Sequence, residues 1–189
     1  MAKTSNFSLL CGFGNSAGNS PQAIVADYLP ALKLVADAPR GQSVFRQHCM
    51  ACHKIGNDGF AVGPDLTTSA TRDPAALLAH ILDPNQHVLP NYVQYLIADR
   101  NGRIFTGLIA AETATSITVR RDNNNEEAIL RSDIEEMTST GKSLMPEGLE
   151  RQLSKQDMAD LLAYLGTIQP APPLDIGTTP GLVEPTRRP

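Results

Sequence analysis

The sequence contains no tryptophan, and aromatic residues make up only 5% of its 189 residues. Large aromatic side chains supply much of the apolar burial in small domains, so a chain this poor in them has little material for a core. The shortage suggests that something other than side chains fills part of the interior.

Basic charge and long apolar runs are also lacking. The net charge is −4 and the pI is about 5.5, which excludes the basic surface expected of a nucleic-acid-binding domain. No apolar run approaches the length of a transmembrane helix, and no intact signal peptide is recognised at the N-terminus. We therefore expect no nucleic-acid partner and no transmembrane segment. The length allows one ordinary domain with tails.

Cysteine is scarce as well, because the chain has only three. Two of them lie three positions apart in the run "CMACH", where His53 directly follows Cys52. Cys11 is left over and is expected to be a free thiol in the N-terminal segment. The pair is compatible with a zinc site, a redox pair, a disulfide or an attachment site for c-type haem.

Three of these alternatives meet difficulties. Structural zinc usually needs two such pairs, and His80 and His87 are not at a finger-like spacing from the single pair. A thioredoxin-type pair follows a strand in a βαβ unit, whereas a helix is predicted here, and a simple disulfide leaves His53 unexplained. Cys-x-x-Cys-His is the attachment sequence of haem c. We therefore predict one haem c bound covalently at Cys49 and Cys52, with His53 as an iron ligand.

A haem iron that carries electrons needs a sixth ligand, and Met145 is the first choice. It precedes Pro146, which stiffens the backbone beside the sulfur, in a loop before the last predicted helix. Met137 is the runner-up. The weaker candidates are Met50 in the attachment loop, Met158 on a helix face, and the histidines His48, His80 and His87, which we expect on the surface.

Local signals predict the secondary structure. Helices are expected over residues 22–29 behind Ser20, over 41–48, from Asp73 to 82, and from the Ser154 capping box to 168. Three to four antiparallel strands are expected over about 92–130, with turns at Asn101-Gly102 and Asp122–Asn125. Six apolar residues are candidates for the face of this sheet that packs on the rest of the domain: Tyr92, Leu96, Ile104, Leu108, Ile117 and Val119.

Four segments together resemble a known family. "GQSVFRQHCMACH", "VGPDLT", "SLMPEGL" and "DLLAYL" resemble class I cytochrome c, and in particular the haem-binding domain family named from planctomycetes and verrucomicrobia. The resemblance covers about residues 28–168. It implies a mainly α cytochrome c fold of class I, with a small antiparallel β insertion between the middle helix and the distal methionine loop.

The resemblance also implies roles for individual positions. Cys49 and Cys52 match the thioether cysteines, and His53 matches the proximal ligand. Met145 matches the distal ligand, so His53 and Met145 are the expected iron ligands. Two further positions match residues beside the haem: Pro64, whose carbonyl accepts a hydrogen bond from the proximal imidazole, and Leu66, which packs on the haem. Gly41, Phe45 and Tyr164 match the contact between the first and last helices.

The expected organisation follows from these assignments. A disordered tail (1–20) and a short helical linker (21–39) precede a cytochrome c domain (40–168) with its β insertion at about 92–130, and a proline-rich tail (169–189) follows. The expected function is single-electron transfer by one haem, with no catalytic residue. The alternative is a haem sensor or peroxidase with a displaceable sixth ligand.

The surroundings of the protein are expectations of the same kind. The family often ends large secreted dehydrogenase-like proteins, so the natural chain can be longer than this one. The partners implied are a dehydrogenase that donates electrons and a terminal or soluble acceptor. Because haem c is attached outside the cytoplasm in the bacterial proteins that the chain resembles, the expected location is the periplasm or an equivalent compartment.

Overall fold

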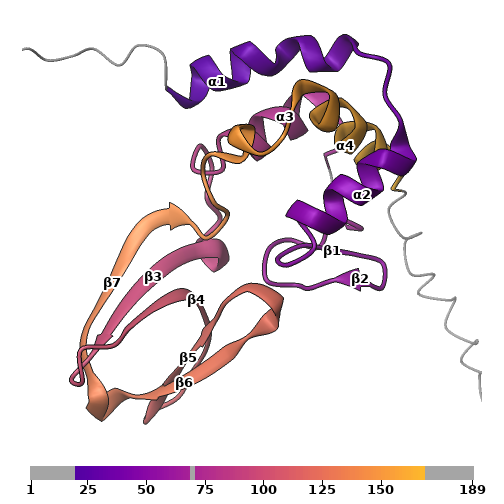
Figure 1. The fold of residues 1–189 in the computed structure, drawn as a ribbon. Helices are drawn as coiled ribbons and strands as arrows, with labels where there is room; N and C mark the ends of the chain where they lie inside the picture. The colour runs from indigo at the N-terminus through magenta and orange to yellow at the C-terminus, as the bar shows by residue number, and fades with distance from the viewer. Residues whose placement is uncertain (1–19, 69–70, 169–189) are drawn as a thin grey trace, which may run out of the picture.

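The computed structural model describes residues 20–68 and 71–168, and these residues form a helical part and a β-sheet (Figure 1). Except for Ser20, the two predicted tails lie outside the described residues, as does Cys11. The helices are α1 (Pro21–Tyr28), α2 (Ala38–His48), α3 (Pro74–Leu82) and α4 (Lys155–Thr167). Short 3-10 helices are η1 (Leu29–Lys33), η2 (Pro90–Tyr92), η3 (Asp122–Asn124), η4 (Arg131–Asp133) and η5 (Leu149–Arg151). None of the helices within the described residues has the length and apolar character needed to cross a membrane.

Three helix starts are confirmed where the sequence predicted them. The side chains of Ser20 and Asp73 accept hydrogen bonds from backbone N–H groups in the first turns of α1 and α3. Ser154 and Asp157 form the reciprocal capping box of α4. Helix α2 begins earlier than predicted, at Ala38, because Asp37 caps it by accepting a hydrogen bond from the Arg40 backbone N–H at 3.0 Å.

Helices α2 and α4 cross in close contact. A Cβ on Gly41 would overlap the backbone carbonyl of Asp160, so glycine is needed for the approach. Beside this point the ring centroids of Phe45 and Tyr164 lie 5.8 Å apart. These are the three positions at which the family resemblance implied a helix contact.

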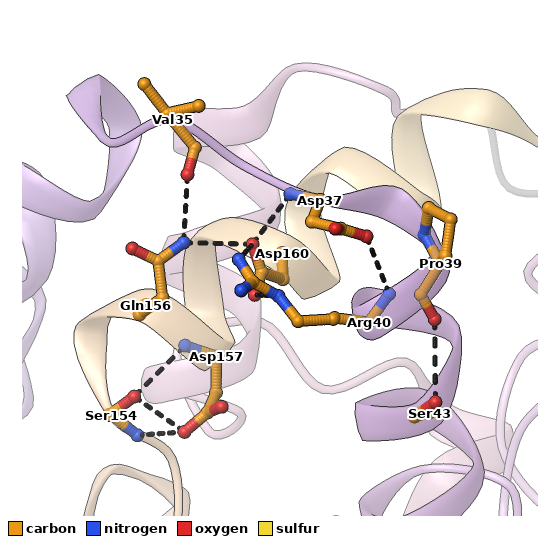
Figure 2. Close-up of polar contacts among 9 residues, drawn as sticks. All are labelled: Val35, Asp37, Pro39, Arg40, Ser43, Ser154, Gln156, Asp157 and Asp160. Carbon is orange, nitrogen blue, oxygen red and sulfur yellow. Dashed lines mark hydrogen bonds and ion pairs between the residues drawn. The ribbon is translucent and has the colours of Figure 1, made fainter.

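The same crossing contains a buried carboxylate, that of Asp160, which is 2% exposed. Figure 2 shows the side chains of Arg40 and Gln156 and the backbone of Asp37 converging on it. Arg40 donates two hydrogen bonds at 2.9 and 3.1 Å, the Asp37 N–H donates one at 2.7 Å, and Gln156 donates one at 2.9 Å. The network ties α4 to the segment that leads into α2.

The sheet is antiparallel and has five strands in the order β6-β5-β4-β3-β7. Its strands are β3 (Val93–Asp99), β4 (Ile104–Glu112), β5 (Ser116–Arg120), β6 (Glu126–Leu130) and β7 (Ile134–Ser143), and a separate two-stranded ribbon pairs β1 (Lys54–Ile55) with β2 (Asp58–Gly59). The predicted turns at Asn101-Gly102 and Asp122–Asn125 are confirmed as the β3–β4 and β5–β6 connections.

The prediction of a mainly α, class I cytochrome c fold with a small β insertion is wrong. The described residues form four α-helices and a five-stranded sheet whose last strand, β7, continues well beyond residue 130. The sheet also has a core of its own, separate from that of the helices. Its buried members are Ile97, Phe105, Ile117, Val119 and Ile129.

The prediction for the packing face of the sheet is correct only in part. Ile117 and Val119 belong to the sheet's own core, whereas Ile104 and Leu96 are 71% and 42% exposed. The physical reason is that the apolar side chains of paired strands pack against one another in the sheet's own core, so they do not need the helices for burial. The other two candidates, Tyr92 and Leu108, line a cavity that the helical part also lines.

The chain enters and leaves the five-stranded sheet at neighbouring points. Val93 at the start of β3 pairs with Ser143 at the end of β7, and the Leu144 N–H donates to the Tyr92 carbonyl at 3.3 Å. Figure 1 shows β3 and β7 entering the helical part together. The chain therefore leaves and re-enters the helical part at one point, immediately before Met145.

Candidate functional site

The site begins where α2 ends and the chain winds into a tight loop that carries the two cysteines. The Cys49 carbonyl accepts hydrogen bonds from the N–H groups of Cys52 and His53 at 3.0 and 2.9 Å. The Cys52 carbonyl accepts from Val62 and Gly63 at 3.1 and 2.7 Å. These bonds bring both thiols and the imidazole to one wall of a common cavity.

The cavity has a volume of about 410 Å³ and lies between the helices and the sheet. Most of its wall is apolar, with Phe45, Leu77, Leu161 and Leu165 among the contributors from α2, α3 and α4. A cavity of this size is in the range of small-molecule and cofactor sites. All six residues predicted for the site line it: Cys49, Cys52, His53, Pro64, Leu66 and Met145.

The imidazole of His53 is held in one orientation. Its Nδ1 lies 2.9 Å from the carbonyl oxygen of Pro64, which can only accept a hydrogen bond, so Nδ1 carries the proton and Nε2 keeps a free lone pair. Burial lowers the pKa of His53, and the bond to Pro64 partly opposes this. A Cβ on Gly63 would lie 2.7 Å from the ring carbon Cε1, so glycine at this position leaves room for the ring. The arrangement gives a neutral imidazole with Nε2 available as a metal ligand.

The two thiols are unlike those of a redox pair. Burial raises the pKa of Cys49 to about 12, and the neighbouring Cys52 adds to the effect. Burial also raises the pKa of Cys52, with a further contribution from the carboxylate of Asp122. Reactive cysteines of disulfide oxidoreductases have lowered pKa values, because the thiolate is the nucleophile. The environment therefore does not favour the redox-pair alternative.

Met145 reaches the cavity from the loop that follows β7. Its backbone N–H donates to Ser143 Oγ at 3.1 Å, which helps to fix the loop. Its rivals lie elsewhere: Met137 is on β7 and 39% exposed, and Met158 is fully buried in the helical core. Among the methionines within residues 20–68 and 71–168, Met145 is the one that lines the cavity.

Several cavity residues were not assigned to the site from the sequence. Leu108 of β4 and Tyr92 of η2 bring the sheet into the wall, and both had been candidates for a packing face without a defined contact. His80 and His87, expected on the surface, are exposed but also border the cavity. The local pattern marks Tyr92 and Leu108 as packing residues but cannot place them at the cavity, because the pairing of β3 with β7 is what brings the sheet to the helices.

Comparison with known families gives a match over part of the chain. Residues 36–100 match the model of the family described as cytochrome c oxidase, cbb3-type, subunit III. No match is found among curated proteins. The family match shows a cytochrome c-type domain in this part of the chain, which implies covalently bound haem c and haem-based electron transfer. The matched segment contains the cysteine loop and ends before Met145.

The residues present fit a haem c group. The cavity offers two neutral thiols, a neutral imidazole with a free Nε2, and largely apolar walls for a flat macrocycle. Haem iron in c-type cytochromes takes histidine and methionine ligands, and both side chains line this cavity. The two thiols and the histidine are those of a haem c attachment sequence, and Met145 lines the same cavity.

Proposed function

We propose that the protein is a monohaem c-type cytochrome that transfers single electrons, and that His53 and Met145 would bind the iron. The observation that carries the proposal is the shared cavity. It brings together the Cys-x-x-Cys-His loop, the Pro64-bonded imidazole and Met145, which are distant in the sequence. Haem c, when bound, supplies the reversible one-electron chemistry of its iron.

The chain's own residues have distinct roles in this proposal. Cys49 and Cys52 would form the thioethers, so the haem stays bound whatever its oxidation state. The Pro64 carbonyl accepts a hydrogen bond from Nδ1–H of His53, which leaves Nε2 free to bind the iron. The apolar walls exclude water, which limits the reorganisation that accompanies a change of charge. With His53 and Met145 both bound, the iron would have no open position for a substrate, so we propose an electron carrier and not an enzyme.

The partners and location are part of the proposal. A dehydrogenase module or protein would donate electrons, and a terminal or soluble protein would accept them. Cytochrome c-type domains are usually found outside the cytoplasm, which supports a periplasmic or equivalent location. The natural protein can include further modules joined to this chain.

The alternative is a haem sensor or peroxidase, for which the sixth position must be open or easily vacated. One observation supports this alternative. His80 and His87 are exposed and border the cavity, so they could transfer protons to a molecule bound there. Carbon monoxide separates the two functions. A reduced electron carrier with Met145 on the iron binds it poorly, whereas a sensor or peroxidase binds it readily.

The primary test is the covalent bond. The protein is produced in a host that attaches haem c, extracted with acid acetone, and weighed by mass spectrometry. We expect the chain to carry the added mass of one haem and to give the reduced spectrum of a low-spin c-type cytochrome. A bare-chain mass from correctly exported protein, or loss of the haem into the acetone, contradicts the proposal.

A further inference from the structure

The cysteine loop makes one hydrogen bond with the distant sheet. The carbonyls of Cys49, Met50 and Cys52 accept hydrogen bonds from backbone N–H groups that follow soon after in the chain, the last of them that of Gly63. The carbonyl of Ala51, between the two cysteines, instead accepts from the backbone N–H of Asn123 at 2.7 Å. Asn123 lies in η3, in the turn between β5 and β6. The sheet is thus joined directly to the loop that would carry the haem.

The turn has the conformation needed for this contact. Asn123 and Asn124 both have positive φ angles, 54° and 55°, which asparagine tolerates better than most residues. The Arg121 N–H donates to Asn125 at 2.8 Å, and the Asn125 N–H donates to Asp122 at 3.1 Å. These two bonds close the turn and leave the Asn123 N–H directed outward. Figure 1 shows the β5–β6 turn next to the loop that follows α2.

The turn also carries a negative charge next to this contact. Asp122 directly precedes Asn123, whose backbone N–H binds the Ala51 carbonyl between the two cysteines. The neighbouring cations are engaged elsewhere: Arg120 pairs with Glu126 at 2.7 Å, and Arg121 lies 3.5 Å from Glu127. The turn does not line the cavity itself, so it lies on the outer side of the loop.

We propose that the β5–β6 turn, residues 121–125, is an electrostatic cap on the cysteine loop, and that Asp122 lowers the reduction potential of the haem bound there. The proposal rests on the function proposed above. Oxidised iron carries one more positive charge than reduced iron, so a nearby carboxylate favours the oxidised state. The hydrogen bond from Asn123 to Ala51 keeps Asp122 next to the cysteine loop, and so near the haem that the loop would carry. Asp122 is a positioning and tuning residue and binds no iron.

The test compares two variants that remove the same charge. Asp122→Asn removes it from the cap, and Asp133→Asn removes it from η4 at the opposite end of β6. We expect Asp122→Asn to shift the reduction equilibrium toward the reduced form by about two- to tenfold, where tenfold is 59 mV for one electron. Asp133→Asn should shift it less, and Asp122→Glu should stay near wild type. Because the turn is exposed, the difference should shrink at high salt.

A measurement on the wild-type protein covers the case in which Asp122→Asn fails to mature. In the oxidised protein the paramagnetic iron shifts nearby NMR signals, so the Asn123 amide should show a large difference between redox states and exchange slowly with solvent. A fast-exchanging amide with no redox-dependent shift overturns the cap. Equal potentials for Asp122→Asn and Asp133→Asn overturn the tuning role, although the haem is attached. A wild-type protein without covalent haem instead contradicts the proposed function.

Discussion

At the residue scale, the site depends on how the imidazole of His53 is held. The Pro64 carbonyl fixes the tautomer, and the lack of a side chain at Gly63 leaves room for the ring. A hydrogen bond to Nδ1–H makes Nε2 a stronger donor to a metal and prevents the ring from turning. The run "VGP" at 62–64 therefore orients the proposed ligand, although it would supply no atom to the iron.

Gly63→Ala should disturb this arrangement. The new Cβ would lie 2.7 Å from Cε1 of His53, so either the ring or the backbone must move. We expect the free energy of unfolding of the haem protein to fall by about 1–3 kcal/mol, the usual range for overpacking. Chemical denaturation followed through the haem absorbance measures it. Gly166→Ala is the matched control, because a Cβ there meets nothing within 4 Å and a helical alanine should be neutral or stabilising. Equal losses in the two variants would refute the argument.

Met145→Ala tests the proposed sixth ligand. Without the thioether we expect the weak near-infrared sulfur-to-iron band to disappear, carbon monoxide to bind the reduced protein, and the reduction potential to fall, because methionine ligation raises it. Optical spectra and a redox titration measure these changes. Met137→Ala is the control, since Met137 is on the sheet and outside the cavity wall. If the control loses the band and Met145→Ala keeps it, the ligand has been assigned to the wrong sulfur.

At the element scale, the crossing of α2 and α4 positions the cysteine loop. Gly41 allows the close approach, and the Asp160 network fixes the start of α2 against α4. Burial alone would raise the pKa of Asp160, but the hydrogen bonds from Arg40, Asp37 and Gln156 outweigh it, and the pKa lies below its ordinary value. The carboxylate is therefore bound as an anion in the folded state.

This lowered pKa gives a pH dependence of known sign. A carboxyl group whose pKa is lower in the folded state stabilises the fold above the unfolded pKa, near 3.9, and loses that contribution as the pH falls through the folded pKa. We expect Asp160→Asn to lose about 1–3 kcal/mol at pH 7 and to show a smaller decrease in stability on acidification than the wild type. Thermal melts from pH 7 to below 3 measure both effects.

Asp27→Asn is the control for that experiment. Asp27 pairs with Lys155 at 2.8 Å, but its side chain is 67% exposed, so its removal should cost at most about 1 kcal/mol. A loss at pH 7 as large as that of Asp160→Asn would show that helix contacts other than the buried network dominate.

The elements also show what a sequence can predict. Helix starts at Ser20, Asp73 and Ser154, and the hairpin at Asn101-Gly102, follow from residues close to one another in the chain, and the structure confirms them. Strand β7 could not be found in this way. Its sequence, "IEEMTSTGKS", is mostly exposed and has no regular alternation, because it is an edge strand. The cysteine loop was evident from its motif, whereas the sheet residues near it depend on pairings between distant segments.

At the scale of the whole molecule, the helical part and the sheet meet at one cavity. On β4, Phe105 and Ile109 face the sheet's core, and Leu108, on the opposite face, lines the cavity wall. The sheet also contacts the cysteine loop through Asn123 and leads directly to Met145. It therefore touches the proposed haem site on the cysteine side and on the methionine side.

The last prediction concerns removal of the sheet. Val93 and Ser143 are paired, so a short Gly/Ser turn can replace residues 94–142 without stretching the chain. The helical core is separate from that of the sheet, and it keeps the cysteine loop, so we expect haem still to attach. The loop of Met145 loses its anchor and the cavity loses Leu108, so the near-infrared band should weaken and the potential fall. Leu108→Ala in the intact chain shows how much of the change in band and potential comes from the loss of Leu108 from the cavity wall. If the excised protein keeps its band and potential, and only its reaction with a partner slows, the sheet is a docking surface and does not support the ligand.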